Sequence, residues 1–333
     1  MGADMQEQQT VIRISAAGGP EVLLPETAPV PRPRDGEVLI AVKAAGVNRH
    51  DCNQRRRGPS PEHSDVPGLE VAGVVVAVGH GVAAGWMGQA VCALTDGGGY
   101  APFAIAQAAQ TLPVPDGLSW TEAAALPEAA FTVWHNFFGV ARLGAGESVL
   151  IHGGTSGVGT LAIQVLTALG HPVYVTCGSP DKVAAARRLG ARAAIDYRRE
   201  DFVGVLHEHT GGRGVDVILD MSGGQYAAAN VDALARRGRI VHLSPGAGAV
   251  FQAPLRALMA KEAIVTGSLL RPLPDAEKAA IAERLRSVVW PLIHSRRVHP
   301  VLHGTLPLAD AAQAHRVMEA GAHIGKIVLV AEP

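Results

Sequence analysis

Apolar and polar residues follow two different patterns along the chain. From Val11 to about Pro115, short apolar runs of β type occupy residues 38–42, 71–79 and 90–94. Glycine and proline separate these runs at short intervals, as they do where strands are joined by tight turns. This part of the chain is therefore predicted to form an antiparallel or barrel-like all-β body.

From about Thr121 to Leu270, strand-like apolar runs alternate with segments of helical periodicity. Such alternation is typical of a parallel sheet with helices on both faces. The later strands are predicted at residues 215–220, 239–244 and 264–268, and the tail is predicted to add helices at 275–293 and 308–320 and a strand at 326–330.

A glycine-rich turn lies between an apolar strand and an apolar helix in this second pattern. The strand is predicted at residues 148–152, the turn at 153–159 and the end of the helix at Gly170, with a further strand at 173–176. A turn without side chains lets backbone amides approach a pyrophosphate, and a helix N-terminus adds unpaired N–H groups. The pattern predicts a dinucleotide site; the alternative is a βαβ turn with a structural role only.

The residues after the strand at 173–176 indicate which dinucleotide is bound. Sites selective for NAD usually carry Asp or Glu here, whereas this chain has Gly178 followed by Ser179 and Lys182. A small residue beside a hydroxyl and a cation accommodates a 2′-phosphate, which an acid would repel. NADPH (NADP+) is therefore predicted over NADH. Asp181 is expected in the first turn of the next helix, and the alternative for Lys182 is a solvated helix residue.

Composition excludes several classes of function. The chain has 333 residues, 18% of them charged, and a formal net charge of −1, which gives no basis for binding nucleic acid or an anionic membrane. No run of about 18 apolar residues could span a bilayer, and the N-terminus lacks an apolar signal segment. Three widely spaced cysteines suggest reduced thiols and a cytoplasmic location.

Six stretches spread over nearly the whole length resemble the medium-chain dehydrogenase/reductase superfamily. The resemblance is to its zinc-independent quinone oxidoreductase branch, and most of all to the tumour-suppressor-inducible quinone oxidoreductases. The stretches are residues 45–51, 67–73, 123–128, 152–159, 196–202 and 324–329. This resemblance implies a GroES-like, mostly β substrate domain built from residues 1–125 and 271–333, with a Rossmann-type doubly wound parallel sheet, residues 126–270, inserted in it.

Zinc-dependent members of that superfamily differ from this chain at the metal ligands. They place a cysteine where this chain has Asn48 and a histidine where it has Leu69. Leucine cannot coordinate zinc, and an asparagine amide is a poor ligand compared with thiolate or imidazole. The fourteen histidines offer no regular ligand spacing, and His207 and His209 point to different sides of a helix. No metal site is predicted.

Without a Lewis acid, an electron-poor acceptor is the natural partner of a nicotinamide. The resemblance implies an NADPH-dependent quinone oxidoreductase that transfers hydride directly from nicotinamide C4 to a quinone. Two alternatives stay open: reduction of an activated C=C bond, as in an enoyl or alkenal reductase, and a non-catalytic, crystallin-like NADPH-binding protein. The family commonly forms homodimers through an edge strand, expected here at residues 264–270.

The resemblance also assigns roles to individual residues. Asn48 is the candidate catalytic residue and a contact near the nicotinamide; the alternative is a turn residue that caps a helix. Thr132 would contact the cofactor, or bond only its own helix backbone, and Tyr197 would face the 2′-phosphate or be an ordinary aromatic at a strand end. The remaining cofactor candidates are Gly154, Thr155, Ser156, Gly157, Val158, Gly178, Ser179, Lys182, Ser222, His242, Leu243, Ser244, Leu269, Leu270 and Lys326.

The run Arg55–Arg56–Arg57 is a departure from the usual loop of the family. Such a run is most often a solvated face, and the alternative is a position at the mouth of the cleft that attracts anions.

Overall fold

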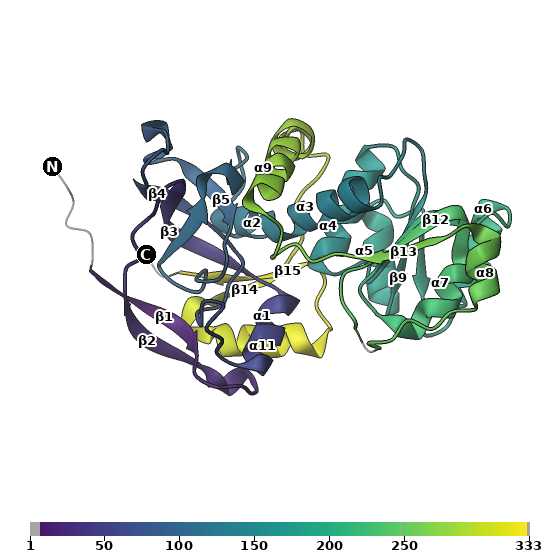
Figure 1. Cartoon of the computed structure of the whole chain (residues 1–333), viewed down its shortest axis with the longest axis horizontal. Coiled ribbons are helices and arrows are strands. Elements are labelled where there is room, and N and C mark those ends of the chain that lie inside the picture. Colours follow the sequence, from purple (N-terminus) through teal and green to yellow (C-terminus); the bar gives the residue numbers. More distant parts are fainter. Residues whose placement is uncertain (1–6, 247, 332–333) are drawn as a thin grey trace. The chain divides into compact units, whose positions relative to one another are not determined.

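The computed structural model describes residues 7–246 and 248–331, which form two compact units (Figure 1). Among the described residues, the first contains 7–129, 274–294 and 300–331, and the second contains 130–246, 248–273 and 295–299. These limits differ by a few residues from the domains expected from the sequence, because helix α3 (Pro127–Trp134) runs across the first boundary. The outermost residues of the expected substrate domain, 1–6 and 332–333, lie outside the described residues.

The first unit is built around a seven-stranded sheet in the order β14-β15-β3-β4-β5-β7, with β6 paired to β3. Its pairs are antiparallel except for β14 with β15, which confirms the predicted antiparallel body. A separate hairpin joins β1 to β2. The strands are β1 (Gln8–Ile14), β2 (Leu23–Pro29), β3 (Glu37–Val47), β4 (Glu70–Val78), β5 (Ala90–Leu94), β6 (Phe103–Gln107), β7 (Thr111–Pro113), β14 (Leu302–Pro307) and β15 (Lys326–Val330).

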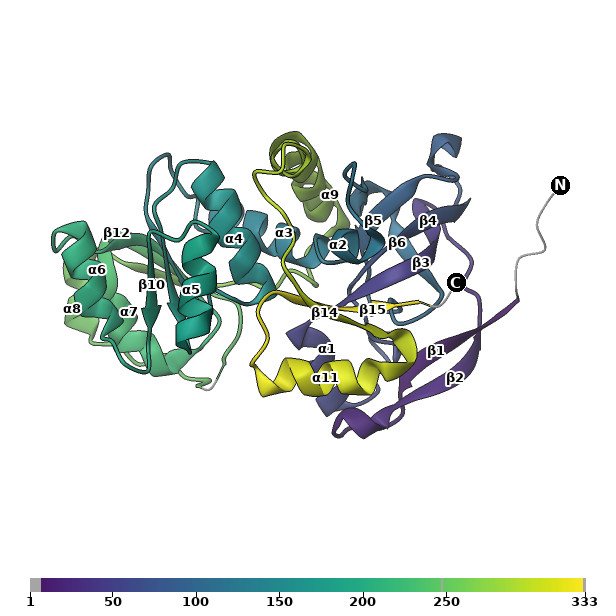
Figure 2. The ribbon, with the colours of Figure 1, turned by 180° about the vertical axis from the view of Figure 1, so that it is seen from behind.

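Helices of the first unit cover this sheet and include two in contact with each other, α1 and α11, which lie side by side in both views (Figures 1 and 2). The helix predicted over 275–293 is interrupted by a π-helical stretch at Leu285–Val289, because the apolar pattern continues while the turn widens by one residue. The helices are α1 (Arg49–Arg57), α2 (Trp120–Ala124), α9 (Asp275–Arg284), α10 (Trp290–His294) and α11 (Ala311–Ala320).

The second unit is a six-stranded sheet, parallel throughout, in the order β10-β9-β8-β11-β12-β13. Helices α4 and α5 lie on one side of it and α6, α7 and α8 on the other (Figure 2). The elements are β8 (Val149–His152), α4 (Gly157–Ala168), β9 (Val173–Cys177), α5 (Pro180–Arg188), β10 (Ala193–Asp196), α6 (Phe202–Thr210), β11 (Val215–Asp220), α7 (Ala227–Ala233), β12 (Leu234–His242), α8 (Leu255–Lys261) and β13 (Ile264–Gly267). This is the doubly wound arrangement that the alternating pattern predicted.

Local sequence explains where the helices of the second unit begin. Ser156 and Ser179 are the N-cap residues of α4 and α5, and each hydroxyl accepts a backbone N–H from the first turn. Pro180 occupies the first position of α5, where its missing N–H costs nothing, and Asp181 lies in the first turn as expected. Since the strands are parallel, their carboxyl ends and these helix starts meet at one edge of the sheet.

Candidate functional site

The glycine-rich turn connects the end of β8 to the start of α4 in the way the sequence predicts. A Cβ on Gly154 would lie 2.5 Å from Val175 Cβ, and one on Gly159 would lie 2.5 Å from the carbonyl oxygen of Gly153. The Ser156 hydroxyl accepts the Gly159 amide at 3.0 Å. Amides in the first turn of a helix have no intrahelical acceptor, so those at 157 and 158 can face an anion. The turn has the form of a phosphate cradle that a side chain would fill.

The end of β9 brings together four residues that were expected around a 2′-phosphate. A Cβ on Gly178 would come within 2.8 Å of Tyr197 Oη, so the phenol occupies the space next to the glycine. Ser179 caps α5 and accepts the amide of Lys182 at 3.4 Å. Partial burial lowers the pKa of Lys182, and the nearby Arg198 cation lowers it further, while Cys177 opposes both. Arg198 is therefore a second cation at this corner, and no role was assigned to it from the sequence.

The other predicted residues of this unit follow the ends of β11, β12 and β13. The Ser222 amide donates to Asp220 Oδ1 at 2.6 Å, and the Leu243 amide donates to the Asp220 carbonyl oxygen at 2.9 Å. His242 Nδ1 lies 3.6 Å from Asp220 Oδ2. These contacts attach both loops to Asp220, one through its buried carboxylate and the other through its carbonyl oxygen. The remaining candidates of this edge show no such anchoring: Ser244 accepts the Gly246 amide, Leu270 is half-buried and Leu269 is 69% exposed.

A buried network of polar side chains holds Asp220 at this edge of the sheet. His152 Nε2 is 2.8 Å from Asn230 Oδ1, and Asn230 Nδ2 donates to Asp220 Oδ2 at 2.9 Å. Because the amide oxygen of Asn230 can only accept, His152 must carry its proton on Nε2. Burial lowers the pKa of His152, which keeps the ring neutral. None of these three roles was predicted, because the partners lie on three separate elements.

Thr132 lies on α3 and is buried. Its carbonyl oxygen accepts the side-chain amide of Asn136 at 2.8 Å. Among the described residues no hydrogen-bond partner is found for its hydroxyl, and its contact with the cofactor stays a prediction.

In the first unit, Asn48 and Lys326 lie together at the ends of β3 and β15. Lys326 Nζ donates to Asn48 Oδ1 at 2.7 Å and forms a buried ion pair with Glu70 Oε1. Asn48 Nδ2 donates to the same Glu70 oxygen at 2.9 Å. The Glu128 amide donates to the other oxygen, Glu70 Oε2, at 2.8 Å. Asn48 is also the N-cap residue of α1, where its backbone amide donates to Asp51 Oδ2 at 2.8 Å, so the residue caps the helix and its side chain belongs to this cluster.

A chain of hydrogen bonds runs inward from this cluster. The Asn48 and Gly68 amides donate to Asp51, whose Oδ2 also accepts Tyr100 Oη at 3.4 Å. His315 Nε2 is 3.1 Å from Tyr100 Oη, and Arg55 lies 3.3 Å from His315 Nδ1. Arg can only donate, so Nδ1 accepts and Nε2 carries the proton. Every donor in the chain therefore points toward Asp51.

Arg55 corrects the expectation of a solvated arginine run. Its side chain is 1% exposed and forms an ion pair with Glu319 of α11, and its Nε donates to the Gly18 carbonyl oxygen at 3.1 Å. Arg56 also reaches Glu319, at 2.9 Å, from a half-exposed position. The run ends α1, where positive charge is favoured, and its first member is buried because α11 supplies the carboxylate.

Burial shifts the pKa values of the titratable groups around Lys326. It raises the pKa of Asp51 to about 6, although the Asn48 and Gly68 amides and Lys326 act in the opposite direction. Burial, followed by the Glu70 carboxylate, raises the pKa of Glu128 to about 8. Lys326 thus pairs with Glu70 and also acts electrostatically on Asp51 and Glu128.

No role was assigned to Glu70 or Glu128 in the sequence analysis, although both lie in stretches that carry the family resemblance. The signal available for Glu70 was that it is an acidic residue at the start of an otherwise apolar strand. Glu128 follows Pro127 at the start of a helix, where a carboxylate is usually explained by the helix dipole.

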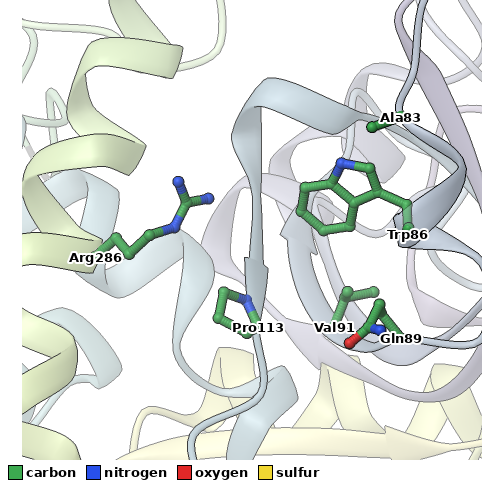
Figure 3. A pocket seen from close by; sticks show the side chains of 7 residues that line it. Ala83, Trp86, Gln89, Val91, Pro113 and Arg286 are labelled. Carbon is green, nitrogen blue, oxygen red and sulfur yellow. The ribbon is translucent and has the colours of Figure 1, made fainter.

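The described residues form no further centre beside these groups. Within residues 7–246 and 248–331, no three His, Cys, Asp or Glu side chains gather closely enough to hold a metal ion. A hollow of about 350 Å³ in the first unit has Arg286 on one side of Pro113 and Trp86 on the other (Figure 3). It contains none of the predicted residues. No helix in the described part of the chain has the length and apolar character needed to cross a membrane.

The sequence and fold are similar to those of known proteins over nearly their whole length. Family models match for an alcohol dehydrogenase GroES-like domain (residues 34–116) and a zinc-binding dehydrogenase (residues 157–285). Quinone oxidoreductase of Rattus norvegicus is 34% identical, with 98% of each chain covered. The structure of Escherichia coli quinone oxidoreductase complexed with NADPH is 30% identical, with a TM-score of 0.84, 97% of this chain and 99% of that chain covered.

A much longer relative also matches nearly the whole of this chain. Phthioceranic/hydroxyphthioceranic acid synthase of Mycobacterium tuberculosis is 33% identical over 98% of this chain, which corresponds to 15% of that protein. The whole fold described above is thus similar both to separate oxidoreductases and to a segment of a much larger enzyme.

Proposed function

Because the chain belongs to the medium-chain dehydrogenase/reductase superfamily, in its zinc-independent quinone oxidoreductase branch, we propose that it is an NADPH-dependent oxidoreductase that reduces a quinone. The observation that carries this proposal is the corner of the second unit where Gly178 lies under Tyr197 Oη and beside Lys182. Position 178 carries no acid for a ribose 2′-hydroxyl, and Lys182 and Arg198 supply cations for a 2′-phosphate.

The second unit fits NADPH by the shape of its glycine turn and the charge at the end of β9. The amides of Gly157 and Val158, with the Ser156 cap, would hold the pyrophosphate. Ser179, Lys182, Tyr197 and Arg198 would hold the 2′-phosphate. When bound, NADPH supplies the hydride that reduces the acceptor.

Residues of the first unit support the proposal that the acceptor is a quinone. Lys326 fixes the Asn48 amide by donating to its oxygen, so the amide plane cannot turn. The residue types at positions 48 and 69 offer neither thiolate nor imidazole to a metal. An acceptor that delocalises negative charge, as a quinone does, needs no Lewis acid at this point.

A reductase of an activated C=C bond is the second candidate function. The match to a relative named as an acid synthase favours it, since that name denotes the building of an acid rather than quinone reduction. The non-catalytic alternative is kept only as an outcome of the experiment below.

We also propose that two copies pair through β13. This strand is an edge of the six-stranded sheet, and its Ile264 is 55% exposed and its Val265 36% exposed. Leu255 and Met259 of the neighbouring α8 are both 70% exposed. An apolar edge strand of this kind pairs readily with another copy of itself. The cytoplasmic location predicted from the cysteines, all three of which are free and buried, stays a prediction.

A substrate panel tests the function directly. Oxidation of NADPH and of NADH is followed with a 1,4-quinone, a 2-alkenal and an enoyl thioester. We expect the highest kcat/KM for NADPH with the quinone. A higher kcat/KM for either C=C substrate supports the second candidate, and tight NADPH binding without turnover of any acceptor supports the non-catalytic alternative.

A further inference from the structure

We propose that Glu128 donates the proton that completes reduction of the acceptor, an inference that rests on the proposed function. Hydride addition leaves negative charge on the acceptor, and a positioned acid that neutralises it accelerates such a step. The candidates are the carboxyl groups around Lys326: Asp51, Glu70 and Glu128.

Asp51 and Glu70 are excluded by burial and by their hydrogen bonds. Both side chains are 0% exposed. Glu70 accepts from Asn48 and Lys326 on one oxygen and from the Glu128 amide on the other. Asp51 accepts two backbone amides and Tyr100 Oη. With every oxygen engaged and shielded, neither carboxylate can meet a substrate.

Glu128 differs from both in its surroundings. It lies in the first turn of α3, and its amide donates to the Glu70 carboxylate that also holds Asn48. The residue is half-buried. Its carboxyl group has no hydrogen-bond or ion-pair partner among the residues that the structure describes. Thr132, a predicted cofactor contact, follows one turn later on the same face of the helix.

Burial and the neighbouring carboxylates favour the protonated form of Glu128. Burial and the Glu70 carboxylate raise its pKa to about 8, with Asp51 adding to the rise. Lys326 of β15 and Lys278 of α9 lower the pKa but do not outweigh these effects. A carboxylic acid with a pKa near the working pH is well matched to proton donation.

The chemistry balances with one hydride and one proton. For a quinone, the hydride brings two electrons and one hydrogen nucleus, and an oxyanion remains. The O–H bond of Glu128 breaks as a new O–H bond forms on that oxygen, which gives the hydroquinone. The Glu128 carboxylate then takes a proton from water. For an activated alkene, the same proton goes to the carbon next to the carbonyl group.

Glu128→Gln tests the proposal because it keeps the size and removes the acid. In the protein without cofactor, infrared difference spectra between pH 6 and pH 10 should show a protonated carboxyl band that disappears near pH 8, and Glu128→Gln should lack that band. With NADPH and quinone, kcat should fall about 10²- to 10⁴-fold, while the Kd for NADPH stays within about twofold. Wild-type kcat should fall above about pH 8, and the variant should not show this fall.

Two further variants separate a proton donor from a structural residue. Glu128→Asp, which keeps the acid, should recover part of the lost kcat. Glu277→Gln, an exposed residue in the first turn of α9, should behave as wild type in every measurement.

Several results would overturn the proposal. Unchanged kcat and pH profile in Glu128→Gln would leave the oxidoreductase assignment standing and remove Glu128 from the chemistry. Loss of NADPH affinity in parallel with kcat would make Glu128 a structural residue. A wild-type protein that reduces neither quinone nor activated alkene would overturn the function and this inference together.

Discussion

The hydroxyl oxygen of Tyr197 lies 2.8 Å from the point where a Cβ would stand at position 178, which is occupied by glycine. The phenol can keep this position only because residue 178 has no side chain. An acid at 178 would displace the tyrosine and repel a 2′-phosphate at the same time.

The first prediction follows from this relationship. Gly178→Asp should weaken NADPH binding by about tenfold or more, which is about 1.4 kcal/mol or more. NADH affinity should change less, because NADH has no 2′-phosphate. Fluorescence titration with both nucleotides measures the two constants. Lys182→Ala is the matched variant, expected to weaken NADPH binding alone; equal losses for NADPH and NADH in Lys182→Ala would contradict the assignment.

The second prediction concerns the buried pair of Glu70 and Lys326. Lys326→Met leaves a fully buried carboxylate without its cation, and breaking such a pair costs about 3–5 kcal/mol. The urea midpoint should therefore drop. The double variant Glu70→Gln with Lys326→Met removes the unpaired charge and should recover most of the loss. A double variant no more stable than Lys326→Met would argue against an electrostatic cause.

The third prediction is a pH dependence of stability that comes from His315. Burial, with a smaller contribution from the Arg55 cation, lowers the pKa of this histidine from 6.5 to about 3. Between these values the unfolded chain binds a proton that the folded chain does not, so stability falls as the pH falls below 6.5. At pH 4.5 the loss from this residue is about 2–3 kcal/mol. His315→Gln should lose less stability than wild type between pH 7 and pH 4.5 in urea titrations.

Asp51 acts in the opposite direction over part of this range. Its folded pKa is raised from 3.8 to about 6, so the folded chain holds the extra proton and stability from this group falls as the pH rises through that interval. Comparison of His315→Gln with wild type at each pH cancels this contribution. An identical pH dependence in the two proteins would exclude the histidine as its source.

The fourth prediction tests pairing through β13. Ile264→Lys places a charge on each side of a symmetric apolar interface and should convert a dimer to a monomer in sedimentation equilibrium. Met87→Lys, which changes a residue 48% exposed in the other unit, is the control and should leave the mass unchanged. A wild-type protein that sediments as a monomer would end the proposal.

Local patterns were enough to predict five strands of the second unit, but no strand was predicted where β10 (Ala193–Asp196) lies. The strand, turn and helix from residue 148 to 170 are predictable because apolar periodicity, glycine and an N-cap serine all act within a few residues. The π-helical stretch at Leu285–Val289 was not predictable, because one extra residue in a turn leaves the apolar pattern nearly unchanged.

Contacts between distant parts of the chain escaped prediction. Glu70 and Lys326 are 256 positions apart, and they meet because β4 and β15 both flank β3. Alternation within a strand shows which side chains face inward but not which strands are neighbours. Arg55 was assigned to a solvated face for the same reason, since its partner Glu319 comes 264 positions later.

Gln164 of α4 donates to the carbonyl oxygen of His299 at 2.9 Å and accepts its amide at 3.0 Å. One carboxamide thus holds residues 295–299 on the nucleotide-binding unit, to which they belong although they are distant in sequence. A truncated fragment of residues 130–273 would expose the buried side-chain amide of Gln164 and would lack residues 295–299, which belong to the unit. An excised version of this unit should fold well only when residues 295–299 are grafted back onto it.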